Sequence, residues 1–218
     1  MRSLVQPPPE LSFDDGADAA DPVVQSFLAR IPAARRLHAA RGLTDEESWR
    51  TLRDLPRHAR LDRLLHGTPG LRKEWWVELA FSGRIFELGR LQLEPRDGYL
   101  AIHIPEEGGP LTPAAVDASL ARARELFPDH VEARCASWLL DPQLADLLPS
   151  GSNIVAFQRR FAPVGETRLG DAEVLEFVFH TLDPDLERLP RATTLQRAVS
   201  EHLRGGGHLY TTTGTFAL

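Results

Sequence analysis

The sequence has only one cysteine among its 218 residues, so it cannot be a small domain held together by disulfides. Cys135 cannot form a disulfide within the chain, which excludes a disulfide-stapled scaffold and fits a reducing compartment. No apolar run is long enough to span a bilayer, so the sequence predicts no membrane helix. The first residues carry three consecutive prolines and several acidic groups instead of the apolar core of a signal peptide. We therefore expect a cytoplasmic protein that has no membrane partner.

The chain also lacks an excess of positive charge. Its 25 Lys and Arg residues face 31 Asp and Glu residues, and the formal net charge is -6. This balance argues against a general affinity for nucleic acid. The locally basic residues 57–63 have no interleaved aromatic residues for stacking on bases, so a solvated helical face explains them better than a phosphate-facing surface. The histidines show neither HExxH nor another paired ligand spacing, and we expect no metal.

Three regions are expected along the chain. Residues 1–20 have little to bury and predict a poorly ordered lead-in. Residues 21–82 predict a helical N-terminal region, and residues 83–218 predict a mixed domain of helices and strands. A chain of this length can bury a substantial core.

Local signals place helices in the N-terminal region. Residues 22–41 predict a helix that bends or restarts at Pro32. A second helix begins at a capping box, in which Thr44 is the cap and Glu47 follows three residues later. The adjacent Trp75 and Trp76 are predicted to be core residues, because side chains of this size are rarely left exposed.

Residues 99–127 predict a strand, a loop and an amphipathic helix in immediate succession. Residues 99–104 alternate between apolar and other side chains, as a strand in a half-buried sheet does. Thr112 is placed to cap the helix, and Pro113 takes the first helical position, where a missing N–H costs nothing. The preceding residues 84–94 predict a strand that pairs with residues 99–104 as an antiparallel hairpin.

The loop between this strand and helix contains Gly108 and Gly109. A glycine loop that turns into a capped helix directs several backbone N–H groups toward one spot beside the positive end of a helix dipole, which suits an anion. The same pattern also occurs in tight connections without any ligand. The local sequence leaves both interpretations open.

The rest of the chain predicts further alternating elements. The expected strands are residues 131–140, 152–161 and 208–218, and the expected helices are residues 141–148, a helix capped by Asp171, and residues 194–204. This order is typical of a sheet packed against helices.

Three segments carry a resemblance to a known family. GRLQLE, LAIHIPEEGGPLTPAAVDASLARARELF and SWLLDPQLADLLPSGSNIVAFQRRF, in this order, resemble the GNAT-like acyltransferases of actinobacterial type, in which a helical N-acyltransferase region precedes a GNAT-like C-terminal domain. The resemblance covers residues 42–218, since GLTDEESWRTLRDL and the WW pair also match. It implies an α/β (α+β) fold with a mixed, mostly antiparallel sheet flanked by helices. The central strand of that sheet splays from its neighbour, and an acyl thioester lies in the gap.

The resemblance implies acetyl-CoA or another acyl-CoA as co-substrate. Strand 100–104 would contact the pantetheine arm, with Ile102 and Ile104 as cofactor-binding residues. The candidates for the phosphate cradle are the backbone N–H groups of Gly108, Gly109, Leu111 and Thr112. The loop departs from the usual Arg/Gln-x-x-Gly-x-Gly/Ala pattern, because it reads PEEGGPLTPAA. The tyrosine that often protonates the departing thiolate in GNAT enzymes is also missing from DPQLADLL.

Two residues are candidates for catalysis. His103 ends the central strand, and a histidine titrating near neutrality suits a general base. Ser137 on the next strand could orient or protonate the thiolate. The alternatives are a structural histidine with a backbone partner and a serine that only fills space. Cys135 is interpreted as a small buried hydrophobe and not as a nucleophile, because no local motif supplies an activating base.

Four residues are candidates for binding the acceptor. Glu106 and Glu107 could bind a cationic amine, although exposed loop carboxylates are common. Asn153 could bind the acceptor or turn the chain into its strand. Tyr210 could reach the acceptor pocket or pack at an edge.

The leading hypothesis is an N-acyltransferase that transfers an acyl group, acetyl in the first instance, from acyl-CoA to a small-molecule amine by direct attack in a ternary complex. One alternative draws the acyl group from an acyl carrier protein or an aminoacyl-tRNA. Another is a catalytically silent GNAT-like binding module. A homodimer is compatible with the sequence.

Overall fold

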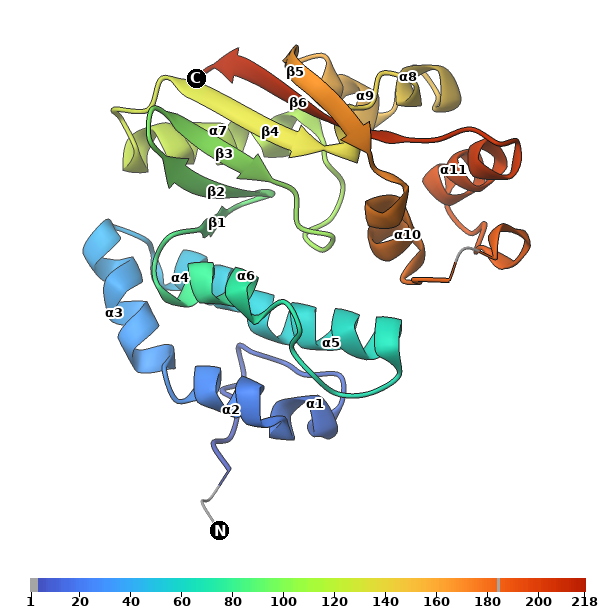
Figure 1. The fold of residues 1–218 in the computed structure, drawn as a ribbon. Coiled ribbons are helices and arrows are strands. Elements are labelled where there is room, and N and C mark those ends of the chain that lie inside the picture. The colour runs from blue at the N-terminus through green and yellow to red at the C-terminus, as the bar shows by residue number, and fades with distance from the viewer. Residues whose placement is uncertain (1–3, 184) are drawn as a thin grey trace. The chain divides into compact units, whose positions relative to one another are not determined.

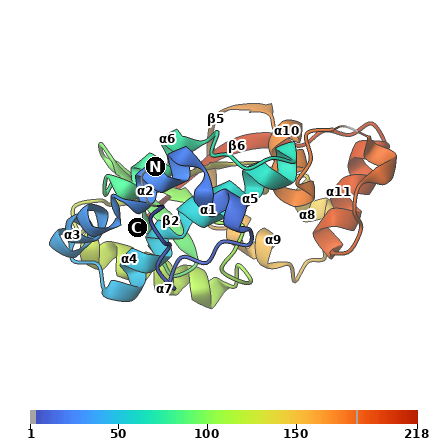
Figure 2. The ribbon, with the colours of Figure 1, turned by 90° about the horizontal axis from the view of Figure 1, so that it is seen from below.

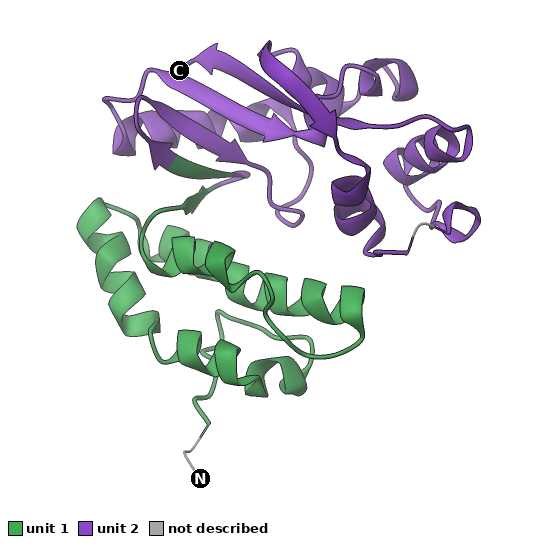
Figure 3. Ribbon diagram, in the orientation of Figure 1, with its two compact units in different colours: residues 1–88, 92–94 green, residues 89–91, 95–218 purple. Residues whose placement is uncertain are grey.

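The computed structural model of the protein describes residues 4–183 and 185–218, and the chain forms two compact units (Figure 3). Unit 1 comprises Met1–Leu88 and Gln92–Glu94. Unit 2 comprises Gly89–Leu91 and Pro95–Leu218.

Unit 1 is helical, and its helices follow local signals in the sequence (Figure 1). Thr44 and Glu47 form the predicted capping box at the start of α4. Pro32 lies in the first turn of α3, so the predicted restart of the first long helix is confirmed. The elements are α1 Gly16–Ala20, α2 Pro22–Leu28, α3 Ile31–Arg41, α4 Asp45–Leu52, α5 Asp54–His66, α6 Glu74–Phe81 and the short strand β1 Phe86–Leu88.

The segment expected as a lead-in contains more structure than its composition predicts. Leu11 is 1% exposed and belongs to the core cluster of unit 1, and α1 follows it. Asp18 on α1 is buried and accepts a hydrogen bond from Arg63 at 2.9 Å. A single apolar anchor and an ion pair with a distant helix thus order this segment, and neither signal is visible in local composition. Residues 1–3 of the predicted lead-in lie outside the described residues.

The tryptophan pair divides between core and surface. Trp76 packs against the core cluster of unit 1, whereas the Trp75 residue is 62% exposed. Successive residues of a helix point about 100° apart, so on α6 Trp76 faces the core cluster of unit 1 and Trp75 points away from it. The prediction that both are core residues is therefore wrong for Trp75.

Carboxylates neutralise the basic residues of α5. Arg57 is buried and forms ion pairs with Asp54 and Glu87. Burial raises the pKa of the Glu87 carboxyl, and the neighbouring Arg57 opposes that shift. The expectation of a solvated basic face is wrong at Arg57, because the guanidinium faces the interior of unit 1.

Unit 2 contains most of a six-stranded sheet, whose order within residues 4–183 and 185–218 is β1-β2-β3-β4-β6-β5. β3 and β4 are parallel, while β4 with β6 and β5 with β6 are antiparallel. A two-residue turn at Asp97 and Gly98 joins β2 to β3. The bounds are β2 Leu91–Arg96, β3 Tyr99–His103, β4 Glu132–Ser137, β5 Ala162–Leu169 and β6 Tyr210–Ala217. The mixed α/β fold class predicted from the sequence is confirmed.

Helices flank this sheet, and α7 and α9 lie along one face of it (Figures 1 and 2). A second core cluster joins the helices after β4 to β6 through residues such as Trp138, Val174 and Leu203. The elements are α7 Pro113–Leu126, the 3-10 turn η1 Trp138–Leu140, α8 Leu144–Leu147, α9 Asn153–Gln158, α10 Asp171–Phe179, the 3-10 turn η2 Leu186–Arg188 and α11 Thr194–Arg204.

Four predicted elements differ from the structure. The predicted strand 131–140 ends at Ser137, whose hydroxyl caps the 3-10 turn η1 at residues 138–140. Residues 84–94 form two strands, because the chain turns at Gly89, whose φ of 73° is in the left-handed region. Residues 152–161 form α9 instead of a strand, since Ser152 caps a helix there, and the strand β5 follows. Asp171 is the first residue of α10 and not its cap; its carboxylate accepts the N–H of Leu209 at 2.8 Å.

Candidate functional site

The parallel strands β3 and β4 separate toward their carboxyl ends. In the described chain their ladder pairs Leu100 with Ala133 and Ala101 with Arg134. β4 continues as far as Ser137, and on its other side it stays paired with β6 over this whole length. The last rung of this ladder therefore lies two residues before the end of β3 and three residues before the end of β4. We call this place the open end of the sheet.

The loop 104–112 leaves the open end and leads into α7. Gly108 and Gly109 have φ values of 106° and 82°, which only glycine adopts without strain. Thr112 caps α7 as predicted, with its hydroxyl accepting the N–H of Ala115 at 3.2 Å. In the described part of the chain, no protein acceptor is found for the backbone N–H groups of Gly108, Gly109, Leu111 and Thr112.

These are the four groups that the sequence predicts for a phosphate cradle, and their role in binding stays a prediction. Gly108 and Gly109 are exposed, so water or a ligand can satisfy their N–H groups. A loop rich in such donors beside a helix N-terminus suits an anion.

Arg90 holds the loop from behind, although sequence reasoning did not single it out. It lies in the turn between β1 and β2 and is buried. Its Nε donates to the carbonyl oxygen of Gly109 and its Nη1 to that of Pro105, both at 2.8 Å. No local signal identifies this role, since the two acceptors lie 15 and 19 residues further along the chain.

Glu106 is engaged by a second residue that the sequence analysis missed. The Nε2 atom of His180 lies 2.6 Å from its carboxylate. His180 follows α10 and has a φ of 51°, a left-handed conformation unusual for a residue with a side chain. The loop 104–112 is thus fixed through both its backbone and the carboxylate of Glu106.

Both predicted catalytic residues lie at the open end. His103 is the last residue of β3, and Ser137 is the last residue of β4. Because the two strands are parallel, their carboxyl ends lie at the same edge of the sheet. The Ser137 hydroxyl accepts the N–H of Leu139 at 3.1 Å and so caps η1, which leaves its proton available for donation.

Cys135 is two residues before Ser137 on the same face of β4. It is buried, and burial raises the pKa of its thiol to about 12. A thiol with that pKa carries almost no thiolate at neutral pH. The structure thus agrees with the interpretation of Cys135 as a packing residue.

The predicted acceptor-binding residues do not all gather at one place. Tyr210 begins β6, which is antiparallel to β4, so it lies at the same edge as Ser137 and is 38% exposed. Glu107 lies exposed in the loop 104–112. Asn153 is the first residue of α9, on a helix that packs against η1.

A further cation lies at the first turns of α7. Arg160 donates to the carboxylate of Asp117 at 2.7 Å and to the carbonyl oxygen of Pro113 at 3.4 Å. The hydrogen bond from Arg160 lowers the pKa of the Asp117 carboxyl. Arg160 and Asp117 therefore form an ion pair at the first turns of α7.

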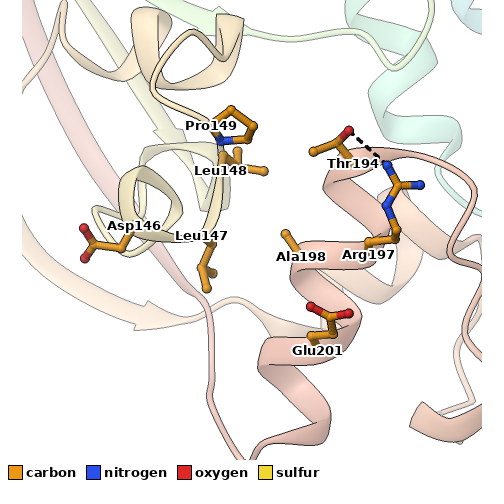
Figure 4. Close-up of a pocket in the computed structure, with 8 residues that line it drawn as sticks. All are labelled: Asp146, Leu147, Leu148, Pro149, Thr194, Arg197, Ala198 and Glu201. Carbon is orange, nitrogen blue, oxygen red and sulfur yellow. Dashed lines mark hydrogen bonds between the residues drawn. The ribbon is translucent and has the colours of Figure 1, made fainter.

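A groove of about 550 Å³ lies elsewhere in unit 2, between α8 and α11 (Figure 4). Arg197 and Glu201 of α11 line one side, and the guanidinium of Arg197 donates to Thr194 at 3.2 Å. None of the predicted site residues lines this groove. We therefore assign the candidate site to the open end of the sheet.

The described residues show neither a metal centre nor a membrane-spanning helix. Residues 4–183 and 185–218 contain no group of three or more His, Cys, Asp or Glu side chains that could hold a metal ion. Across the same residues, every helix is too short or too polar to cross a bilayer.

Comparison with protein families finds two matches along the chain. Residues 2–83 match the N-acyltransferase N-terminal domain, and residues 59–216 match the GNAT-like C-terminal domain. The two matches overlap between residues 59 and 83. No curated protein matches the chain.

Comparison with solved structures finds acyltransferases. The chain is 39% identical to an acyltransferase in complex with decanoyl-CoA and teicoplanin, with a TM-score of 0.83 over 100% of this chain and 72% of that one. An acyltransferase in complex with decanoyl-CoA is 40% identical, with a TM-score of 0.83 over 96% of this chain and 70% of that one. An acyltransferase mutant in complex with octanoyl-CoA is 38% identical, with a TM-score of 0.83 over 100% of this chain and 72% of that one.

These matches confirm the resemblance identified in the sequence, because the GNAT-like model alone spans residues 59–216 and the solved acyltransferases share the fold over nearly the whole chain. The chain belongs to the GNAT-like acyltransferases, a family in which an N-acyltransferase N-terminal domain precedes a GNAT-like C-terminal domain.

Proposed function

We propose that this acyltransferase moves a medium-length fatty acyl group from acyl-CoA to an amine of a teicoplanin-like acceptor. The similar structures were solved with decanoyl-CoA, octanoyl-CoA and teicoplanin. The acyl chain of this proposal is therefore longer than the acetyl group that the sequence analysis put first.

The observation that carries the proposal is the end of the β3–β4 ladder at Ala101 and Arg134. Beyond it, the two strands continue past the last rung of their ladder, and a ligand that contains amide groups can pair with a strand edge as an added strand does. Pantetheine contains two amides, so its arm fits there. The donors of Gly108 to Thr112 would then receive the phosphates at the end of that arm.

In this arrangement the acceptor amine attacks the thioester carbonyl directly. His103 at the open end takes the proton that the amine loses, as a general base. The carbon–sulfur bond breaks and an amide forms. Ser137 donates its hydroxyl proton to the departing sulfur while its oxygen still accepts the N–H of Leu139. The proton taken up by His103 then returns to Ser137 through solvent, so both residues regain their starting protonation. The fold contributes mainly the alignment of the two reactants.

For the acceptor, Tyr210 and Glu107 are the proposed contacts. Tyr210 lies at the same edge as Ser137, and Glu107 extends from the loop 104–112 with a charge that attracts a protonated amine. Glu106 lies in the same loop, where its carboxylate contacts His180.

Calorimetric titration with decanoyl-CoA, acetyl-CoA, dephospho-CoA and pantetheine tests the donor. We expect saturable binding of decanoyl-CoA, weaker binding of acetyl-CoA, and a large loss with pantetheine, which lacks every phosphate. Incubation with decanoyl-CoA and teicoplanin, followed by mass spectrometry, tests the transfer: the expected product is heavier by one decanoyl group. If none of these CoA derivatives binds, the proposal is wrong, and the donor must be a carrier protein or the chain a silent binding module.

A further inference from the structure

Arg90 reaches the candidate phosphate site from outside the loop 104–112. Residues 104–112 contain no Lys, Arg or His of their own, and they include Glu106 and Glu107. Arg90 is 8% exposed, and its guanidinium lies against the side of the loop where Pro105 and Gly109 turn their carbonyl oxygens. The structure thus brings a cation to a loop whose own side chains are neutral or acidic.

The two hydrogen bonds from Arg90 bracket the turn of the loop. Nη1 binds the carbonyl of Pro105 before the turn, and Nε binds that of Gly109 after it, each at 2.8 Å. The guanidinium presents its N–H groups in a fixed plane, so one side chain can set the direction of two carbonyls at once. A lysine ammonium carries the same charge but lacks this rigid fork.

The direction of these carbonyls matters for an anion. A carbonyl oxygen is the negative end of the peptide dipole and repels phosphate, whereas an N–H attracts it. The described chain contains no cis peptide bond, and in a trans peptide the C=O and the following N–H point in opposite directions. Binding the Pro105 oxygen on the Arg90 side therefore turns the next N–H, that of Glu106, to the other side of the loop.

The turn that carries Arg90 is itself attached to α7. The Arg90 N–H donates to the hydroxyl of Ser119 at 2.8 Å, and that hydroxyl donates to the carbonyl of Ala115 at 3.0 Å. A Cβ on Gly89 would lie 2.9 Å from the same hydroxyl oxygen, which is too close for any other residue. Glycine therefore permits the turn to approach the helix this closely. Turn, loop and helix thus form one hydrogen-bonded unit.

We propose that Arg90 is a positioning residue for the phosphates of the acyl-CoA donor. It holds the carbonyls of Pro105 and Gly109 away from the site, turns the N–H of Glu106 toward it, and so fixes the loop that carries the N–H groups of Gly108, Gly109, Leu111 and Thr112. This inference rests on the proposed function and adds a residue to its donor site.

The test compares two donors that differ only in the phosphate-bearing part. Arg90→Lys and Arg90→Met are assayed with decanoyl-CoA and with S-decanoyl-pantetheine, which keeps the thioester and lacks the phosphates. We expect kcat/KM for decanoyl-CoA to fall at least ~10-fold in both variants, mostly through KM, because the loop N–H groups are no longer held in line with the phosphates and their charge-assisted hydrogen bonds weaken. For S-decanoyl-pantetheine we expect a change below ~2-fold, since no phosphate is present.

Arg204→Met is the matched control. Arg204 lies on α11, where it forms an ion pair with Glu187 away from the loop 104–112. Losing this guanidinium is expected to leave kcat/KM for both donors unchanged. Ser119→Ala provides a second route, because it removes the anchor of the Arg90 backbone while keeping the guanidinium; we expect the same selective loss at a smaller size, ~3-fold.

The outcomes separate this inference from the function on which it rests. If the wild-type protein transfers nothing from decanoyl-CoA, the proposed function fails. If it does transfer, but uses S-decanoyl-pantetheine equally well, the phosphates contribute nothing and the role of Arg90 is refuted. An equal loss for both donors in the Arg90 variants shows that Arg90 is only structural. Should those variants not fold, Ser119→Ala decides the question: an equal loss of kcat/KM for decanoyl-CoA and S-decanoyl-pantetheine in this variant refutes the role.

Discussion

The buried ion pairs of unit 1 differ from the loop 104–112 of unit 2. Unit 1 buries charged side chains in contact with each other: Arg57 lies between Asp54 and Glu87, and Asp18 accepts from Arg63. Unit 2 instead leaves backbone donors in the loop 104–112 without a protein acceptor and ends a strand ladder early. Polar groups that satisfy each other maintain a fold, whereas polar groups left unsatisfied in an ordered loop are available to a ligand. The contrast predicts that substitutions in unit 1 change stability and those at the loop change binding.

The largest effect is expected from Arg57→Met. This change leaves Asp54 and Glu87 buried without their cation, which costs about 3–5 kcal/mol in the free energy of unfolding. Chemical denaturation measures that loss. Arg50→Met is the control, because the Arg50 pair with Glu46 is exposed and contributes less than about 1 kcal/mol. Equal losses in the two variants would show that burial of the pair is irrelevant.

Gly109→Asp tests the loop 104–112, where the expected effect is on donor binding. A carboxylate at this position meets the phosphates of the donor, and we expect the affinity for decanoyl-CoA to fall by about 100-fold, or ~2.7 kcal/mol. Gly98→Asp is a closely matched control. Its φ of 85° is near the 82° of Gly109, and a Cβ at either position meets no atom within 4 Å. Calorimetry that finds the same affinity in both variants would refute the placement of the cradle.

The pH dependence of stability sharpens the comparison within unit 1. His38 is fully buried, and burial is the main cause that lowers its pKa, against the hydrogen bond with the Ala80 carbonyl. The unfolded chain then binds a proton near pH 6.5 that the folded chain does not, so stability falls as pH drops below that value. Denaturation midpoints between pH 7.5 and 5.5 measure the slope. His38→Gln should flatten it, and an unchanged slope would assign it to other groups.

The smallest effect is expected at Cys135. Its thiol has a pKa of about 12 and is buried, so we expect no reaction with a thiol reagent at pH 8 until the protein is denatured. Cys135→Ala should keep kcat within about 3-fold, because the thiol takes no part in the proposed transfer. Rapid labelling of the native protein, or loss of transfer in this variant, would reopen the case for a nucleophile.

Features fixed by neighbouring residues were predictable from the sequence. Thr112 with Pro113, and Thr44 with Glu47, define helix starts because a cap bonds only within its own first turn. The strand before the loop was also predictable, since its burial alternates residue by residue. The four candidate cradle donors follow from the same local reading, and their role in binding stays a prediction.

Features fixed by distant residues were not predictable. The pairing of His180 with Glu106 joins residues 74 positions apart, and Arg90 reaches a loop beyond the intervening hairpin. The segment around Phe157 forms a helix although its apolar residues suit a strand, because Ser152 supplies a cap and β5 takes the sheet position instead. Tertiary context decides such segments over local propensity.

The position of β6 between β4 and β5 constrains how the protein is made. The ladder joins Glu132 to Ala217 and Ser137 to Thr212, so β4 has no partner on that side until residues about 80 positions later have been synthesised. The helices of unit 1 depend on closer contacts and can form while translation continues. The chain is therefore expected to pass through a stage on the ribosome in which unit 1 is folded and β4 is an uncovered edge, when chaperone contact matters most.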